Sequence, residues 1–298
     1  MSIYLACGLL IDSELKLPLA PAPVLTGNAD VRVFRDAVPL PFHGASDCAN
    51  WEVTDRQVLF RVAGIVRFVI SAAREVRFEL EGRANDADAI PFLLSTALGA
   101  LLHQRKLLAL HAGAVSLNGQ AIALCGPAGV GKSTLIASLC ASGCELLGDD
   151  VSVIQRDASG RPWLLSDGRH HQLWADSIEQ LHLTERQGPP IREGLRKFHV
   201  APAKATYPAS LPLKTIVLLR GLSQPARSRV CPLQPADAMA ALMRTIFCPS
   251  LATSLKCDGL LFTQIAATLP WVQVLCLDRH SRFQNLTNDV QRLLEHLQ

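Results

Sequence analysis

Aromatic residues are scarce in this chain of 298 residues, at 5% of the sequence. Proteins that bind single-stranded nucleic acid stack its bases on aromatic side chains, so this composition disfavours that class. Charge of one sign is also lacking, because the formal net charge is only +3 and Lys and Arg form no long run. A surface for nucleic acid or for a membrane is therefore not expected.

Long apolar runs and paired cysteine motifs are missing as well. No apolar stretch approaches the roughly 20 residues that a membrane span requires, and the N-terminus lacks the basic start of a signal peptide. The nine cysteines are odd in number and contain no CxxC pair. They predict free, buried thiols in a reducing cytoplasm and not a disulfide framework.

The pattern of the chain changes near residue 88. Residues 1–87 contain short, β-branched runs separated by Pro, Gly, Asn and Asp, which predict a β-rich domain that begins with a strand over residues 3–11. This domain has no cluster with obvious chemistry, so we expect a scaffold or a module that holds a peptide. Residues 88–298 begin with a predicted helix over 88–105 and then alternate strands and helices, with a hairpin turn at Asn118-Gly119 and a closing amphipathic helix over 284–297, which predicts an α/β domain.

Residues 126–133 match the phosphate-binding pattern G-x-x-x-x-G-K-[ST] in full. Its glycines let backbone N–H groups converge on phosphate oxygens, and the helix predicted over 132–142 adds the positive end of its dipole. Lys132 is expected to reach the outer phosphates, and the Ser133 hydroxyl to hold Mg²⁺. Contacts to the nucleotide are expected from Gly126, Pro127, Ala128, Gly129, Val130, Gly131, Lys132, Ser133 and Thr134.

Asp149 and Asp150 end the apolar strand predicted one helix after the loop. One carboxylate can hold Mg²⁺ while the other accepts a proton from an attacking hydroxyl. Their order along the strand favours Asp149 on the metal and Asp150 as the base, although adjacent acids exchange such roles easily. His111 is a third candidate, because its strand is predicted to pair with the strand before the loop.

Basic residues further along the chain could contact phosphate or substrate, or could form a solvated basic loop. These residues are Arg169, Arg196, Lys197 and Lys204. The adjacent histidines His170 and His171 do not predict a metal site, because successive strand residues point to opposite faces.

Three motifs together resemble a known family: "LHAGAV", "GPAGVGKSTL" and "LLGDDVSV", in this order and at this spacing. They are similar to the catalytic domain of HPr serine kinase/phosphorylase, a P-loop kinase family related to phosphoenolpyruvate carboxykinase. The motifs cover about residues 105–155, and residues 156–298 agree by pattern. The resemblance implies a P-loop kinase core, ATP and Mg²⁺ as cofactors, base and magnesium roles for Asp149 and Asp150, an active-site role for His111, and assembly into oligomers.

Three other segments resemble one branch of that family: "LLIDSELKLPL", "LWADSIEQL" and "PWVQVLCLDRH". They are similar to HPr-kinase-like proteins encoded with lasso peptide biosynthesis genes, which phosphorylate a serine hydroxyl, typically at the C-terminal end of the precursor peptide. Thr134 stands where the bacterial family usually has an acidic residue. The downstream signature that accompanies phosphorolysis is not found, which leaves the reverse reaction without support.

The predicted function is thus an ATP- and Mg²⁺-dependent kinase that phosphorylates a serine of a peptide, with a lasso peptide precursor as the acceptor that the resemblance implies. Two alternatives stay open. The chain could phosphorylate an HPr-type carrier protein or a small molecule, or it could bind a nucleotide in a regulatory role without catalysis. The carboxylate pair argues against the regulatory role, since a protein that only binds a nucleotide needs no base.

Overall fold

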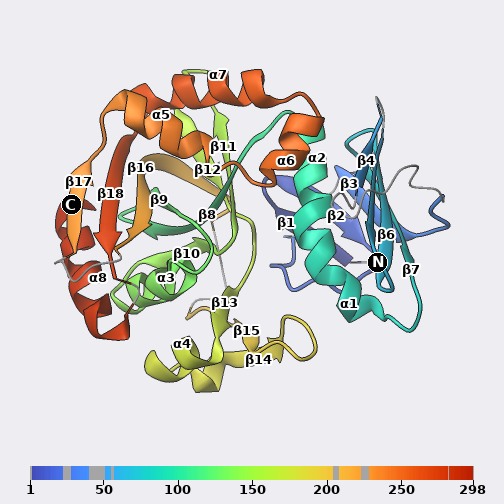
Figure 1. Cartoon of the computed structure of the whole chain (residues 1–298), viewed down its shortest axis with the longest axis horizontal. Helices are drawn as coiled ribbons and strands as arrows, with labels where there is room; N and C mark the ends of the chain where they lie inside the picture. The colour runs from blue at the N-terminus through green and yellow to red at the C-terminus, as the bar shows by residue number, and fades with distance from the viewer. Residues whose placement is uncertain are drawn as a thin grey trace.

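The computed structural model describes residues 2–22, 28–39, 51–54, 57–203, 208–222, 228–280 and 282–297. Within these residues it shows a mixed α/β protein with sheets of seven, eight and three strands. The seven-stranded sheet lies at one end of the molecule, the eight-stranded sheet at the other, and the small sheet below them (Figure 1).

The seven-stranded sheet is built from the N-terminal part of the chain. Its strands are β1 (Ser2–Ala6), β2 (Leu9–Ser13), β3 (Val31–Arg35), β4 (Trp51–Val53), β5 (Gln57–Val62), β6 (Val66–Ser71) and β7 (Glu75–Leu80). The single strand predicted over residues 3–11 is wrong, because β1 and β2 form a hairpin there. Cys7 and Gly8 both have positive φ, at 54° and 75°, which gives the tight turn that joins two antiparallel strands.

The helix predicted over residues 88–105 is present as a helical segment, and it packs on this sheet. It consists of α1 (Asp86–Phe92), a π-helical turn (Leu93–Ala97) and α2 (Leu98–Gln104). Asn85 begins it with a capping box, accepting from the Ala87 N–H at 2.8 Å. Pro91 lies inside α1 and has no N–H to donate, and the wider π-helical turn follows it directly. Apolar side chains of the helices and of the sheet form one continuous core.

The eight-stranded sheet carries the glycine-rich loop. Its strands are β8 (Leu108–Leu117), β9 (Gln120–Cys125), β10 (Glu145–Gly148), β11 (Val151–Arg156), β12 (Pro162–Leu165), β16 (Ser210–Gly221), β17 (Arg229–Pro232) and β18 (Gln273–Arg279). The predicted hairpin at Asn118-Gly119 joins β8 to β9. Strands β9, β16 and β18 are parallel neighbours, so they end at the same edge of the sheet. The loop after β9 therefore lies near the end of β18.

Helices cover both faces of this sheet (Figure 1). The helices α3 (Lys132–Ala141) and α8 (Phe283–Leu297) share one apolar core with β9, β16 and β18, whereas α5 (Pro235–Met243), α6 (Pro249–Ser254) and α7 (Asp258–Thr268) belong to the core on the other face. Short 3₁₀ turns occur at Thr184–Arg186 and Leu269–Trp271. None of the helices among the described residues is long and apolar enough to cross a membrane.

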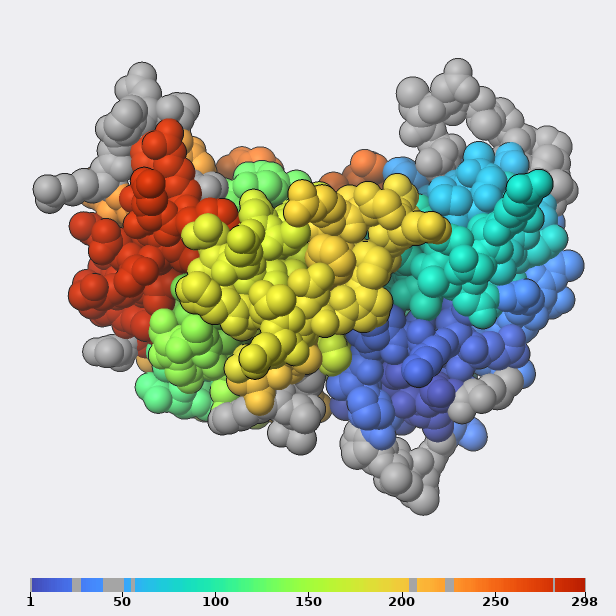
Figure 2. All heavy atoms as spheres, turned by 90° about the horizontal axis from the view of Figure 1, so that it is seen from below, coloured from blue at the N-terminus to red at the C-terminus, as the bar shows by residue number. Residues whose placement is uncertain are grey.

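The small sheet follows the carboxylate pair in the chain. It contains β13 (His171–Trp174), β14 (Gln187–Pro190) and β15 (Lys197–Val200), and α4 (Ala175–Gln180) continues directly from β13. Seen from below, this segment occupies the surface between α8 and the N-terminal sheet (Figure 2). This segment thus forms one wall of the space next to the glycine-rich loop.

Candidate functional site

The glycine-rich loop, residues 126–131, connects the end of β9 to the start of α3. Gly129 and Gly131 have φ of 80° and 86°, in the left-handed region that favours glycine. A Cβ atom on Gly131 would lie 2.7 Å from Nη1 of Arg279. A side chain would therefore be strained by the backbone conformation at both positions and would also be obstructed at Gly131.

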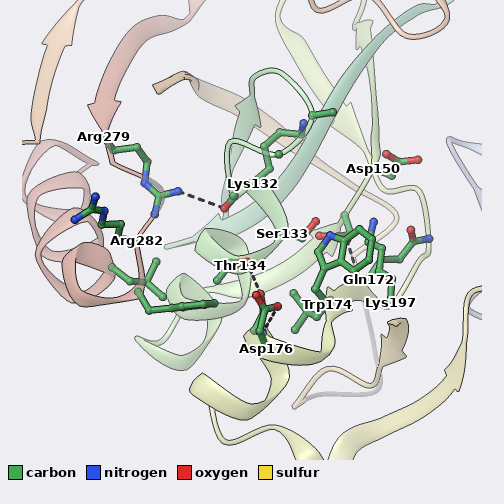
Figure 3. A pocket seen from close by; sticks show the side chains of 18 of the residues that line it. Lys132, Ser133, Thr134, Asp150, Gln172, Trp174, Asp176, Lys197, Arg279 and Arg282 are labelled. Carbon is green, nitrogen blue, oxygen red and sulfur yellow. Dashed lines mark hydrogen bonds between the residues drawn. The ribbon is translucent and has the colours of Figure 1, made fainter. Parts of the chain in front are cut away.

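Arg279, at the end of β18, braces this loop (Figure 3). Its Nη1 donates to the Val130 carbonyl at 2.9 Å, and its Nε donates to Oδ2 of Asp289 in α8 at 2.7 Å. Both charged side chains are almost fully buried. The pairing leaves Arg279 with a fixed position, and through it α8 holds the loop.

Lys132 and His111 meet on the inner side of the loop. The Lys132 Nζ donates to the carbonyls of Gly126 at 2.7 Å and Pro127 at 3.3 Å, and it lies 3.1 Å from the His111 Nε2. An ammonium group can only donate, so Nε2 is the acceptor and Nδ1 carries the proton of neutral His111. Burial lowers the pKa of Lys132, partly offset by the charges of Asp150 and Asp149.

Asp149 and Asp150 lie between β10 and β11 and have different surroundings. Asp149 is buried; its Oδ2 accepts from the Gln172 N–H at 2.9 Å, and its Oδ1 has no hydrogen-bond partner among the described residues. Burial raises the pKa of Asp149 to about 7. A carboxyl group with such a pKa can exchange a proton near neutral pH.

Asp150 is held by two donors. Its Oδ1 lies 3.3 Å from the His111 Nδ1, and its Oδ2 accepts from the Arg169 Nη1 at 2.7 Å. Burial acts to raise the pKa of Asp150, but the hydrogen bond from His111 and the charge of Arg169 outweigh it and hold the pKa well below its usual range. Asp150 is therefore an anion at neutral pH and a weak base.

Asp167 holds the backbone at Asp150 through hydrogen bonds. Its Oδ2 accepts from the backbone N–H groups of Asp150 and Val151, both at 3.2 Å, and lies 3.8 Å from the Arg169 Nε. A Cβ atom on Gly148 would collide with the Asp167 carboxylate. The glycine before the carboxylate pair therefore allows Asp167 to hold the backbone of Asp150.

A cavity of about 420 Å³ lies along the loop and the carboxylate pair (Figure 3). Its charged lining includes Lys132, Lys197, Arg279 and Arg282 as cations and Asp149, Asp150 and Asp176 as anions. The other lining residues are His111, Ala128, Gly129, Gly131, Ser133, Thr134, Gln172, Leu173, Trp174, Ser177, Phe283 and Leu286. The cations of the lining can bind a polyanion, and the carboxylates can bind the divalent cation that accompanies it.

Most residues predicted from the sequence line this cavity, with several exceptions. Gly126 and Pro127 line a second cavity instead, and Val130 is buried. Arg169 does not line the cavity; its side chain is 3% exposed and reaches the site only through Asp150. Arg196 is exposed and does not line it either, and Lys204 lies outside the described residues.

The sequence reasoning missed the wall that faces the loop. Gln172, Trp174 and Ser177 come from β13 and α4, and the Ser177 hydroxyl lies 3.0 Å from the Thr134 hydroxyl. Arg282 directly precedes α8, and Phe283 is its first residue. These residues have no recognisable spacing in the sequence, because they converge from distant elements.

The oxygen donors of the site fit a magnesium ion. Ser133, Asp149 and Asp150 all line the cavity, and the buried Oδ1 of Asp149 lacks a partner within the described part of the chain. Mg²⁺ prefers oxygen ligands and is commonly held by one or two carboxylates together with substrate phosphates. Ser133 and one of the two carboxylates would hold it beside a bound polyphosphate.

Of the comparisons with known proteins, only the comparison with solved structures gives a match. No protein-family profile matches the chain, and no curated protein matches it. Among solved structures, the chain is similar to the Hpr(Ser) kinase/phosphatase from Coxiella burnetii, with 10% sequence identity and a TM-score of 0.33. The match covers 63% of this chain and 95% of the other.

Proposed function

We propose that this protein is an ATP- and Mg²⁺-dependent kinase that transfers a phosphoryl group to the serine hydroxyl of a peptide. The observation that carries the proposal is the carboxylate pair in the cavity of the glycine-rich loop, in which Asp149 has a pKa raised to about 7 and Asp150 is held as an anion. A protein that only binds a nucleotide has no use for a buried carboxylate of near-neutral pKa beside the phosphates.

The direction of the nucleotide follows from the loop. In loops of this pattern the backbone N–H groups cradle the α- and β-phosphates, and the Lys reaches the β- and γ-phosphates. The γ-phosphate would thus lie near Lys132, His111 and Asp150. The nucleoside would continue past Thr134 towards Arg282 and Phe283, a residue that is 36% exposed and lines that end of the cavity.

In the transfer step, the acceptor oxygen forms a bond to the γ-phosphorus while the bond from that phosphorus to the β–γ bridging oxygen breaks, which leaves ADP. Asp149 is the base that accepts the hydroxyl proton, because both oxygens of Asp150 are already engaged by His111 and Arg169. This reverses the order of roles that strand position favoured. Lys132 and the loop N–H groups balance the charge on the transferred group, and Mg²⁺, when bound, would neutralise phosphate charge.

The acceptor is the part of the proposal that rests on sequence resemblance. The resemblance implies the C-terminal region of a lasso peptide precursor as the acceptor. The alternative kinase proposal differs only in its acceptor, which is an HPr-type carrier protein. Trp174 is 50% exposed and lines the cavity beside Lys197, its cross-strand partner on β15. An exposed aromatic ring next to a cation provides a surface on which a peptide could rest beside the γ-phosphate.

Phosphate transfer to defined acceptors tests the proposal. The protein is incubated with ATP, MgCl₂ and either a lasso precursor peptide or an HPr-type carrier protein, and mass spectrometry maps the phosphate. Lys132→Ala should abolish transfer, and Asp149→Asn and Asp150→Asn should each lower kcat by about 10²- to 10⁴-fold. Arg196→Gln is the matched control, because Arg196 is exposed outside the cavity.

Two results would contradict the proposal. If both Asn variants transfer phosphate at the rate of the unchanged protein, the carboxylate pair is only a turn between β10 and β11. If ATP yields only ADP and free phosphate with every acceptor, the protein is a hydrolase or a regulator and not a kinase.

A further inference from the structure

A second cavity, of about 830 Å³, lies on the far side of His111 from the first. It is lined by the end of β16, by Cys276 of β18, by α5 and by the segment between α5 and α6. Its volume is in the range of cavities that enclose an organic ligand or several residues of a peptide. Nothing in the phosphate-transfer machinery described above uses it.

The two cavities meet at the residues that surround the γ-phosphate position. His111 lines both of them, and Gly126 and Pro127, whose carbonyls accept from Lys132, line the second. The nucleoside end proposed for the first cavity, at Arg282 and Phe283, adjoins Arg279, which contacts the other end of the loop at Val130. A molecule in the second cavity would therefore approach the γ-phosphate from the side away from the nucleoside.

The wall next to His111 is fixed to the strand that carries this residue. The His111 backbone N–H donates to the Thr245 carbonyl at 2.7 Å, and the Phe247 N–H donates to the Ala109 carbonyl at 2.9 Å. The His111 and Phe247 rings stack, with centroids 6.3 Å apart. These contacts hold the wall of the second cavity that adjoins His111 against the strand of the site.

The lining of the second cavity is mainly apolar, with charges of both signs at its exposed edge. Leu218, Leu233, Ala240 and Phe247 contribute apolar surface. Asp237 and Arg244, both exposed, belong to α5 and its C-terminal end. This combination complements an apolar side chain whose flanking residues are polar or charged, which is the chemistry of a polypeptide and differs from that of a polyphosphate.

We propose that the second cavity binds the acceptor polypeptide and holds a bulky apolar side chain that flanks the acceptor serine. The inference rests on the proposed kinase function and adds the substrate feature that the site reads. The apolar side chain lies between α5 and β16 and anchors the acceptor polypeptide there. The neighbouring serine hydroxyl then reaches the γ-phosphate next to His111. Selectivity then arises from the residue beside the serine.

A library of serine peptides tests this inference in the full-length protein. Each peptide has one central serine, and the flanking positions are varied one at a time among Leu, Phe, Ala, Asp and Lys in the presence of ATP and MgCl₂. The expected result is that one flanking position favours Leu or Phe over Ala by about 10-fold or more in kcat/KM, the contribution of an apolar pocket. Equal rates for Leu, Phe, Ala, Asp and Lys at every position would overturn the inference while the kinase function stands.

Filling the cavity gives the second measurement. Ala240→Trp introduces a large side chain at an exposed lining position, and Ala236→Trp makes the same change on the same helix outside the lining. Ala240→Trp should raise the KM for the favoured peptide about 10-fold or more and leave the Kd for ATP unchanged, whereas Ala236→Trp should change neither.

The outcomes distinguish failure of the second-cavity inference from failure of the kinase function. A weaker Kd for ATP in Ala240→Trp would show that the second cavity holds the nucleoside, which overturns the inference. An unchanged KM in Ala240→Trp would overturn it as well. Failure of every peptide and of both acceptors tested above would instead overturn the kinase function, and the inference with it.

Discussion

At the residue scale, Arg169 is a buried cation whose charge is shared by two carboxylates. It donates to Asp150 at 2.7 Å, lies 3.8 Å from Asp167 and also donates to the Leu94 carbonyl in the helical segment of the N-terminal part. Its side chain is 3% exposed and that of Asp167 is fully buried. Loss of the guanidinium would leave buried negative charge without compensation, which is costly in a low-dielectric interior.

The substitution Arg169→Met tests this role. We expect the free energy of unfolding to fall by about 3–5 kcal/mol, because a buried ion pair would lose one partner. Urea unfolding at neutral pH measures the change. The exposed residue of the same type, in Arg196→Met, should change it by less than about 0.5 kcal/mol, and equal midpoints for the two variants would show that Arg169 does not compensate these carboxylates.

At the scale of elements, residues 166–169 connect the N-terminal sheet to the carboxylate pair. The Cys7 N–H donates to the Ser166 carbonyl at 2.6 Å, and the Ala20 N–H donates to the Gly168 carbonyl at 2.8 Å. On the other side, the Ser166 hydroxyl donates to the Leu147 carbonyl in β10. Asp167 and Arg169 lie in the same segment, so a disturbance of the N-terminal sheet would be transmitted to the backbone and charge of Asp150.

The substitution Gly168→Ala probes this connection. Gly168 has φ of 67°, and a Cβ atom would lie 2.6 Å from the Leu5 carbonyl oxygen. Strain of about 1–3 kcal/mol together with this collision should lower the melting temperature and the rate of phosphate transfer. Gly194→Ala is the matched control, with φ of 76° and nothing within 4 Å of the added atom, so it should cost only about 1 kcal/mol.

The comparison of the two glycine variants decides the point. Both add the same atom at a left-handed position, so a difference between them reports the contact with Leu5. If Gly168→Ala and Gly194→Ala lower the melting temperature equally, residues 166–169 do not connect the N-terminal sheet to the site.

At the scale of the whole molecule, several buried titratable groups set the response to acid. Burial, followed by the charges of His170 and Arg186, lowers the pKa of His171 in β13 to about 4 from the ordinary value of 6.5. The unfolded chain therefore binds the proton first, and this contribution to stability is lost as the pH falls from about 6.5 to about 4. Asp149 acts in the opposite direction, because its pKa is raised to about 7 and the folded protein takes up that proton first.

The substitution His171→Phe isolates one of these effects. Relative to the unchanged protein, the variant should gain about 2 kcal/mol of unfolding free energy between pH 7 and pH 5, since it has no proton to bind in the unfolded state. Urea unfolding of both proteins at the two pH values gives the difference, in which the contribution of Asp149 cancels. A difference that does not change with pH would mean that His171 titrates alike in the folded and unfolded chain.

Local sequence patterns were sufficient for many elements of the fold. The hairpin at Asn118-Gly119, the helix that begins at Lys132, the strand before Asp149 and the last helix all occur as predicted, because each depends on turn chemistry or on periodicity within a few residues. The strand predicted over residues 3–11 failed, since an apolar run hides the turn at Cys7 and Gly8.

The sequence by itself determined the identity and order of the chemistry-bearing groups: a phosphate-binding pattern, His111 before it and two aspartates after it. Only the tertiary structure decided how these groups differ. Asp149 and Asp150 are neighbours in the chain, yet one is buried beside a backbone N–H and the other is paired with His111 and Arg169. Proton affinity depends on burial and on charges within a few ångströms, and distant segments supply those charges, so spacing along the chain cannot show them.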